Sequence, residues 1–233
     1  MDINKPIETK YKVEVADKSK RKRVIKENIA KKALRKHPVP IKGKTVDCKV
    51  VLLPIDIPIY HLNNGRTRAR QRSHIIDNNH KDNYFKDALE NNKQQNIQHK
   101  ILVDLAQVSK SDIYAELKRK AEFRDDSPLL LDSNGVVING NRRLSSIREL
   151  YKSDPKKFQK FKHVPCAIIE QFLDDKQIKQ IENHIQVRKE FKQEYDWISL
   201  ALEVKEEKDI LGVPFSQIAV DMGKSEEAIK RNY

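Results

Sequence analysis

A strand–turn–strand–corner–helix pattern over residues 129–151 most constrains the fold of this chain. Two short apolar runs are joined by Asn134-Gly135, a dipeptide that tolerates the positive φ angles of a tight hairpin turn. The chain then passes through a polar corner at 139–143 and enters a predicted helix over 144–151, whose apolar residues recur at helical spacing. The pattern predicts a β-hairpin that delivers the backbone directly to the start of a helix.

The corner between the second strand and the helix is a predicted anion site. A helix start leaves backbone N–H groups without intrahelical acceptors, and the positive end of its dipole favours negative charge, so phosphate is the natural occupant. Gly140 permits close approach of a ligand, and Arg142 and Arg143 supply forked, charge-assisted donors. An ordinary strand-to-helix turn with surface arginines fits the same short motif.

The remaining segments predict an α+β fold with a helical C-terminal part. Apolar and β-branched runs predict strands over 45–59, interrupted by prolines, and over 163–170. Helical periodicity indicates helices at 78–92, 94–108 and 111–121, and from 174 to the end with breaks at 212–214 and 222–223. The predicted domains are a basic N-terminal arm at 1–45, an α+β domain at 46–173 with a polar insertion at about 71–110, and a helical domain at 174–233.

Positive charge is concentrated at the N-terminus. The net charge is +13, and residues 1–50 hold 16 Lys or Arg against 6 Asp or Glu, whereas the other 183 hold 31 against 28. Such a local field attracts polyanions, most commonly nucleic acid, so we expect DNA contacts at Lys20, Arg21, Lys22 and Arg23. A helix is expected over 20–35, and a solvated, disordered tail is the alternative.

Several classes of protein and site are disfavoured by the sequence. No apolar stretch is long enough to span a bilayer and no secretory signal is present, which predicts a cytoplasmic protein without membrane partners. Cys48 and Cys166 lie far apart without a Cys/His cluster, so neither a disulfide framework nor a zinc site is expected, and Cys166 is predicted to be a core thiol. His74 and His80 fit no ligand spacing and are assigned to the polar insertion.

The segment LLLDSNGVVINGNRRLSSIREL resembles the core signature of the ParB/sulfiredoxin superfamily. Four further segments are similar to family elements in the family's order: LLPIDIPIYHLNNGRTR, HVPCAIIE, IENHIQVRKEFKQEYDWISLALEV and PFSQIAVDMGKSEEAIKRNY. Together they cover roughly residues 50–70 and 111–233. The resemblance implies a ParB/sulfiredoxin-like small mixed sheet with helices, followed by an all-helical C-terminal lobe that contains a helix-turn-helix.

In nucleotide-binding ParB proteins the corresponding segments bind a nucleoside triphosphate. The resemblance implies phosphate contacts from the corner, from a closing arginine and from one later arginine, namely Gly140, Asn141, Arg142, Arg143, Arg66 and Arg188. Glu182 and Asn183 would hold Mg²⁺ or support hydrolysis, with Glu182 as the catalytic candidate; a solvated helix face is the alternative.

Two features of the sequence limit what this resemblance implies. Arg68, Arg70 and Arg72 compete with Arg66 for the role of the closing arginine. Where sulfiredoxins carry the cysteine of their thiolate chemistry, this chain has Asn141, which argues against that activity.

The last twenty residues follow the order of a helix-turn-helix. Gly223 would form the tight turn and Ser225 would cap the second helix. Because such a helix enters the major groove by its N-terminal residues, we expect DNA contacts at Lys224, Ser225 and Lys230. Two glutamates in the same turn face phosphates unfavourably, so a purely structural role is the alternative.

These patterns favour a DNA-associated, nucleoid-located ParB-like protein that binds CTP or ATP with Mg²⁺ and couples the nucleotide to DNA binding. Homodimer formation stays open. A ParB-like nuclease or nucleotide hydrolase, such as a CTPase-like enzyme of a mobile element or defence locus, is the first alternative, so whether the protein is an enzyme also stays open. A non-catalytic adaptor that has kept the fold and lost the ligand is the second.

Overall fold

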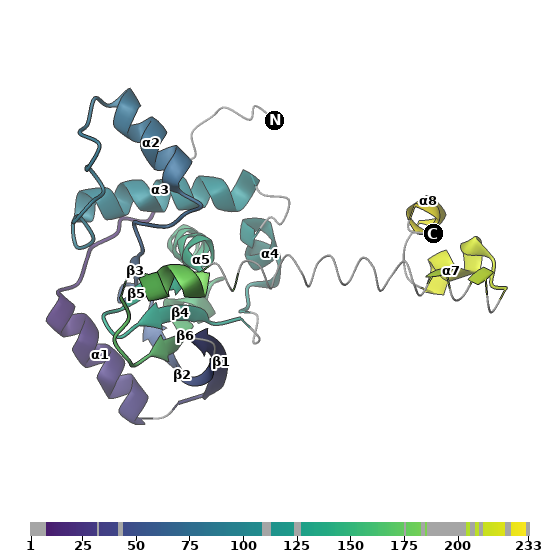
Figure 1. The fold of residues 1–233 in the computed structure, drawn as a ribbon, viewed down its shortest axis with the longest axis horizontal. Coiled ribbons are helices and arrows are strands. Elements are labelled where there is room, and N and C mark those ends of the chain that lie inside the picture. The colour runs from purple at the N-terminus through teal and green to yellow at the C-terminus, as the bar shows by residue number, and fades with distance from the viewer. Residues whose placement is uncertain are drawn as a thin grey trace. The chain divides into compact units, whose positions relative to one another are not determined.

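The computed structural model describes residues 8–31, 33–41, 44–108, 113–123, 127–174, 176–182, 185, 204–205, 208–209, 212–221 and 225–231. The chain forms two compact units, Met1–Ile178 and Lys179–Tyr233 (Figure 1). None of the described helices is both long and apolar enough to cross a membrane.

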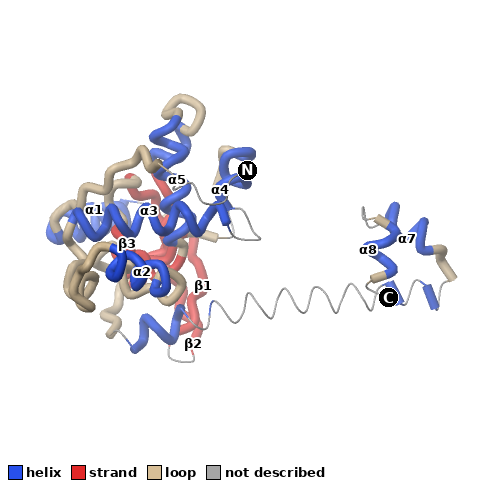
Figure 2. The backbone as a smooth tube through the Cα atoms, turned by 90° about the horizontal axis from the view of Figure 1, so that it is seen from above, coloured by secondary structure: helices blue, strands red, loops and turns tan. Residues whose placement is uncertain are grey.

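A six-stranded mixed sheet forms the centre of the first unit, with the strand order β1-β2-β6-β4-β5-β3. Its strands, drawn in red in Figure 2, are β1 (Arg35–Ile41), β2 (Lys44–Pro54), β3 (Ile59–Tyr60), β4 (Leu129–Asp132), β5 (Val136–Asn139) and β6 (His163–Ile169). The pairs β3–β5 and β4–β6 are parallel, and the other three pairs are antiparallel. The predicted α+β class and mixed sheet are therefore confirmed.

Helices pack around this sheet in both views (Figures 1 and 2). They are α1 (Lys18–Lys31), α2 (Arg68–Asp77), α3 (Asn92–Val108), α4 (Ile113–Lys120), α5 (Asn141–Ser153) and the short 3-10 helix η1 (Gln159–Lys162). Helix α5 lies against β4, α3 packs on α5, and α2 packs on α3. Leu144, Ile147 and Leu150 of α5 are all buried in the core, which confirms the predicted apolar face.

The helix predicted over 78–92 is wrong. Residues 78–91 form turns, and the helix that precedes them is α2, which ends at Asp77. Asn79 and Asp87 adopt positive φ angles of 52° and 58°. Asn and Asp tolerate this conformation and compete with helix through local hydrogen bonds, which explains why turns replace a helix here.

Residues 8–31 and 33–41, expected to lie in a basic N-terminal arm, belong to the first compact unit. Helix α1 packs on β2 through the buried Ile25, and β1 pairs with β2 from Arg35↔Val50 to Ile41↔Lys44. Pro38 and Pro40 lie in β1, at the edge of the sheet, where a missing N–H disrupts no central ladder. The prolines do exclude helix, and the residues instead form a strand.

The segment before α1 is held by side chains rather than by strand pairing. The Glu149 carboxylate accepts hydrogen bonds from the backbone N–H groups of Lys10 and Tyr11, both at 2.9 Å. Asn96 exchanges two hydrogen bonds of 2.8 Å with the backbone of Val13. Tyr11 and Val13 are buried in the core, so this segment is part of the packing that supports α3 and α5.

A buried hydrogen-bonded chain links β3, α3 and α5. The Tyr60 hydroxyl lies 2.7 Å from Nδ1 of His99, and Nε2 of His99 lies 2.7 Å from Oε1 of Glu149. Burial lowers the pKa of His99, and its hydrogen bond to Glu149 offsets this only in part. Burial alone would raise the pKa of Glu149, but hydrogen bonds from His99 and from two backbone N–H groups hold that pKa below its usual value. A neutral His99 whose Nε2–H donates to an ionised Glu149 is consistent with the lowered pKa of both groups.

Arg148 anchors the other side of α5. Its side chain is fully buried and donates to the carbonyl oxygens of Ile55, at 2.7 and 3.0 Å, and of Pro58, at 2.6 Å. Its guanidinium lies 5.1 Å from the ring centroid of Tyr11 and 4.8 Å from that of Tyr60, a cation–π arrangement on both faces. The two ring faces and the carbonyl oxygens offset part of the cost of burying this cation, whose Nη1 has no hydrogen-bond partner.

The second unit contains α7 (Phe215–Asp221) and α8 (Glu226–Lys230). Val204, Ile218, Ala219 and Ile229 form its buried cluster, with Phe215 packed against it. The two predicted helices and their apolar contacts are thus present. The predicted turn glycine, Gly223, lies outside the described residues.

We predict that acidification destabilises the first unit through His99. The pKa of His99 is lowered on folding, so the unfolded chain binds the proton more tightly, and stability is lost as pH falls through the unfolded value of about 6.5. A series of melting temperatures between pH 8 and pH 5 checks this. The fall should be shallower in His99→Gln, and parallel curves for the two proteins would contradict the assignment.

Candidate functional site

The predicted corner is built on a glycine that no other residue replaces without strain. Gly140 precedes α5 with φ 101° and ψ 12°, in the left-handed region. A Cβ atom at this position would lie 2.5 Å from Cδ2 of Leu129, a buried residue of β4. Both the backbone angle and the close packing therefore require glycine, which lets β5 turn directly into α5.

The first turn of α5 presents free backbone donors. No side chain caps this helix, and its first hydrogen bond runs from the N–H of Leu144 to the carbonyl of Gly140. Among the residues that the structure describes, no acceptor is found for the N–H groups of Asn141 and Arg142. These donors and the positive end of the helix dipole favour an anion at the corner.

The side chain of Asn141, predicted to contact phosphate, is buried and hydrogen-bonded within the fold. It is only 3% exposed, its Oδ1 accepts from the N–H of His61 at 3.2 Å, and its Nδ2 donates to the carbonyl of Val137 at 2.8 Å. Asn141 therefore ties the loop after β3 to the start of α5. Only its backbone N–H is left for a ligand.

The loop that carries Arg66 is held in place by buried amides. Oδ1 of Asn64 accepts from the N–H of Arg66 at 2.9 Å, and both the N–H and the hydroxyl of Thr67 donate to the carbonyl of Asn64 at 3.1 Å. Nε2 of Gln98 donates to the Thr67 hydroxyl at 3.1 Å and Nε2 of Gln71 donates to the carbonyl of Leu62 at 2.8 Å. The backbone of Arg66 is thus fixed before any ligand binds.

Arg66 and Arg142 are brought together at this corner. Burial, followed by the positive charge of Arg66, lowers the pKa of Arg142. Arg66 is exposed and Arg142 is half-buried, and neither guanidinium forms an ion pair with a carboxylate in the described part of the chain. Two neighbouring cations without a counter-ion produce a local positive field that a bound anion would neutralise.

The side chain of Arg143 has a different role from that of Arg142. Its guanidinium donates to the carbonyl and hydroxyl oxygens of Ser127, the latter at 2.9 Å, and lies 3.4 Å from the carbonyl of Pro128. These contacts fix the segment that leads into β4. Of the two arginines predicted to bind phosphate, Arg143 is hydrogen-bonded to Ser127, whereas Arg142 has no such contact among the described residues.

The predicted catalytic residue Glu182 belongs to the second unit, whereas the corner belongs to the first. The Glu182 side chain is 2% exposed and lies 3.5 Å from the ammonium of Lys179 within the second unit, so it is neither a solvated face nor an open ligand. Asn183 and Arg188 lie outside the described residues. Over the described ranges there is no group of three or more His, Cys, Asp or Glu side chains placed to hold a metal ion.

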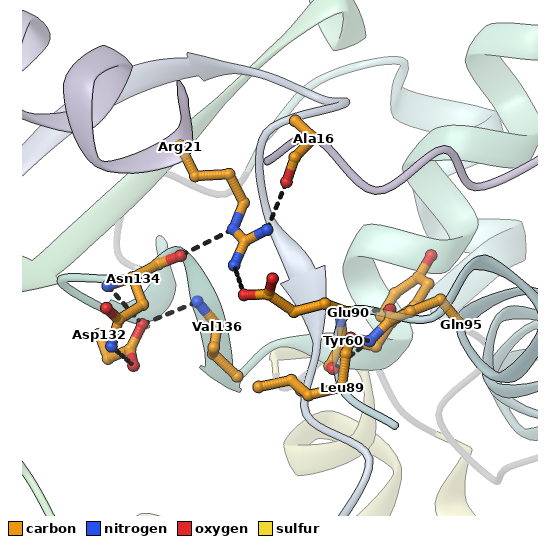
Figure 3. Close-up of polar contacts among 9 residues, drawn as sticks. All are labelled: Ala16, Arg21, Tyr60, Leu89, Glu90, Gln95, Asp132, Asn134 and Val136. Atoms are coloured by element: carbon orange, nitrogen blue, oxygen red, sulfur yellow. Dashed lines mark hydrogen bonds and ion pairs between the residues drawn. The ribbon is translucent and has the colours of Figure 1, made fainter. Parts of the chain in front are cut away.

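Arg21, expected to contact DNA, is instead a buried structural residue (Figure 3). It is fully buried and donates to the carbonyl of Asn134 at 2.9 Å, to the carbonyl of Ala16 and to the Glu90 carboxylate at 2.6 Å. Its guanidinium therefore cannot reach a phosphate without unfolding this region. The sequence does not indicate this placement, because Asn134 and Glu90 are distant from Arg21 in sequence.

The other predicted DNA contacts are exposed, with one outside the described ranges. Lys20, Lys22 and Arg23 lie on the surface of α1, where Arg23 is 3.9 Å from Glu27. Ser225 and Lys230 are exposed at α8, and Lys230 pairs with Glu226 at 2.7 Å. Lys224 is not among the described residues.

Both cysteines are buried in the sheet, which confirms the predicted core role of Cys166. Burial raises the pKa of the Cys48 thiol to about 11 and raises that of Cys166 further. Reactivity requires the thiolate, so these residues offer no sulfur chemistry near neutral pH.

A cavity of about 630 Å³ lies beside Arg21 and was not expected from the sequence. Its lining mixes apolar residues with cations and carboxylates, among them Lys18, Glu90, Asp132, Asp174 and Lys176. Its lining does not include Gly140, Arg66 or Arg142, so this charge-balanced cavity is distinct from the cationic corner. The only sequence signal for it is a set of acidic residues scattered among turns.

No family model matches this chain, and no curated protein and no solved structure matches it either. Membership of the ParB/sulfiredoxin superfamily therefore stays a prediction based on the motifs.

Gly140→Ala is predicted to lower the free energy of unfolding by about 2–5 kcal/mol. Left-handed strain of about 1–2 kcal/mol adds to overpacking against Leu129 of about 1–3 kcal/mol. Gly135→Ala is the matched control: its φ is also positive, at 83°, but the added Cβ meets no atom closer than 3.4 Å. Urea denaturation should show a clearly smaller loss for Gly135→Ala, and equal losses would refute the packing argument.

Proposed function

We propose that this protein binds a nucleoside triphosphate through its phosphates at the Arg66–Arg142 corner and that it associates with DNA. The observation that carries the proposal is the pairing of two unneutralised arginines beside the uncapped start of α5. One guanidinium comes from a loop fixed by buried amides and the other from the first turn of the helix. The site is therefore organised before the ligand arrives, which lowers the entropic cost of binding.

Phosphate is the chemistry that this corner suits best. Guanidinium groups bind phosphate oxygens through two parallel hydrogen bonds, and charge-assisted hydrogen bonds are about twice as strong as neutral ones. The N–H groups of Asn141 and Arg142 add donors that need no movement. A bound phosphate would also remove the repulsion between Arg66 and Arg142, so the free site stores unfavourable electrostatic energy that the ligand releases.

Any Mg²⁺ in this proposal belongs to the nucleotide. Glu182 is buried in an ion pair, and the described residues supply no cluster of carboxylates for a resident ion. A nucleoside triphosphate carries Mg²⁺ on its own phosphates.

The DNA half of the proposal is supported by charge and by the helical second unit. Lys20 and Lys22 are exposed on α1, and no carboxylate of the described ranges pairs with them. The net charge of +13 favours association with a polyanion. Helices α7 and α8 pack on each other in the order of the predicted helix-turn-helix, which supports its role as a second contact region.

We expect a nucleoside triphosphate to raise the melting temperature of the wild-type protein. At about ten times its Kd, a ligand stabilises the folded state by about 1.4 kcal/mol, which corresponds to about 3–6 °C for a chain of this length. The measurement is a thermal-shift series with CTP, ATP, GTP, their diphosphates and inorganic phosphate, each with Mg²⁺.

Arg142→Ala and Arg66→Ala should each lose this shift while melting normally without ligand. Arg119→Ala is the matched control, because Arg119 is an exposed arginine on α4, remote from the corner in sequence. Should no nucleotide shift the wild type at millimolar concentration, the proposal fails and a plain DNA-binding or adaptor role becomes the better one. An equal shift in Arg142→Ala would place the ligand elsewhere.

A further inference from the structure

Helix α2 carries an arginine flank that the predicted contacts do not use. Arg68 and Arg72 are one turn apart, both are exposed, and neither pairs with a carboxylate in the part of the chain that the structure describes. Arg70 lies on the opposite flank, where its guanidinium is 3.3 Å from the Asp104 carboxylate of α3. One arginine of the three therefore serves the fold, and two are left on the surface.

This charge pattern is unfavourable for the helix itself. Like charges at i and i+4 destabilise a helix by about 0.2–0.5 kcal/mol, and cations in the first turn oppose its dipole. The first turn of α2 contains no acidic residue, and the Thr67 side chain makes no capping hydrogen bond. Arg68 and Arg72 thus reduce the stability of α2 without a compensating contact among the described residues, and a bound polyanion would supply that compensation.

The flank is nevertheless held in a fixed position. Gln71 is buried, and its Nε2 donates to the carbonyl of Leu62 and to Oε1 of Gln98, both at 2.8 Å. These bonds fasten the inner side of α2 to α3 and to the loop that carries Arg66. Arg68 and Arg72 are therefore presented by a rigid element that continues directly from the cationic corner.

We infer that Arg68 and Arg72 form a contact surface for the phosphodiester backbone of DNA. A helix rises about 1.5 Å per residue, which spaces the two Cα atoms by about 6 Å along the axis, a distance comparable to that between neighbouring phosphates of one strand. Arginine is suited to this contact because its planar fork binds phosphate in two parallel hydrogen bonds. Contacts of this kind set affinity and position without reading the base sequence.

This inference rests on the DNA association in the proposed function, and it is independent of nucleotide binding. The surface on α2 differs from the DNA contacts expected on α1, where Arg21 is buried. The proposed contact uses the two guanidinium groups alone and requires no stacking of bases. The contact should therefore be dominated by charge and respond steeply to salt.

The test is the salt dependence of DNA binding by the full chain, measured by fluorescence anisotropy with a labelled duplex and a labelled single strand between 50 and about 300 mM KCl. Each lost phosphate contact reduces the slope of log K against log salt by about 0.9 for duplex and about 0.7 for single strands. Arg68→Ala combined with Arg72→Ala should therefore reduce the slope by about 1.8 or 1.4. At about 0.1 M salt, duplex affinity should fall about 60-fold.

Two control variants separate this surface from a general loss of charge or fold. Arg70→Ala removes an arginine from the same helix but from the flank that faces Asp104, and it should leave the slope within error of wild type. Arg68→Lys combined with Arg72→Lys keeps the charges and should retain most of the slope. The double alanine variant should melt no lower than wild type, because it removes a like-charge pair from α2.

An unchanged slope in the double alanine variant, or an equal loss in Arg70→Ala, would overturn the inference while leaving DNA binding itself intact. Absence of wild-type DNA binding at 50 mM KCl would instead reject the DNA half of the proposed function. Tenfold tighter binding of an RNA strand, or of vesicles rich in anionic lipid, would assign the surface to that polyanion and overturn the DNA assignment. The nucleotide shift should persist in the double variant, which keeps the two proposals distinguishable.

Discussion

The position of α5 depends on the buried contacts of Arg148 and Glu149. One side of the helix is held through the carboxylate of Glu149, which binds His99 and the backbone before α1. The other side is held through Arg148, which binds the carbonyls of the turn between β2 and β3. These polar contacts are directional, whereas the apolar face of α5 alone would permit sliding and rotation. The helix start, and with it the cationic corner, is thereby fixed relative to the sheet.

The same helix shows how neighbouring residues with similar chemistry take different roles. Arg142 is half-buried and repelled by Arg66, whereas the adjacent Arg143 is used to hold Ser127. Asn141 lies on α5 next to Arg142, and its amide bonds to His61 in the segment that leads to Arg66. The same amide bonds to Val137 of β5. The corner therefore combines backbone donors, the amide of Asn141 and two guanidinium groups in one connected arrangement.

Local patterns predicted the elements that are determined locally. The Asn134-Gly135 turn, the apolar face of α5 and the strand around Cys166 all follow from residue spacing and turn chemistry. Helix α2 was missed because it is polar and buries only Gln71, so it has no apolar periodicity. Arg21 could not be separated from its basic neighbours, because its partner Glu90 is 69 residues away. A run of basic residues does not indicate which of them will be buried by contacts with distant parts of the chain.

The prolines of β1 have a consequence for assembly between copies of this chain. Pro38 and Pro40 remove two donors from one edge of the sheet, and β3 at the other edge is only two residues long. An incoming strand would find an interrupted ladder at the first edge and almost no ladder at the second. Strand addition is thus disfavoured at both edges of the described sheet. The edge residues of the described sheet therefore disfavour association of copies of this chain by strand pairing.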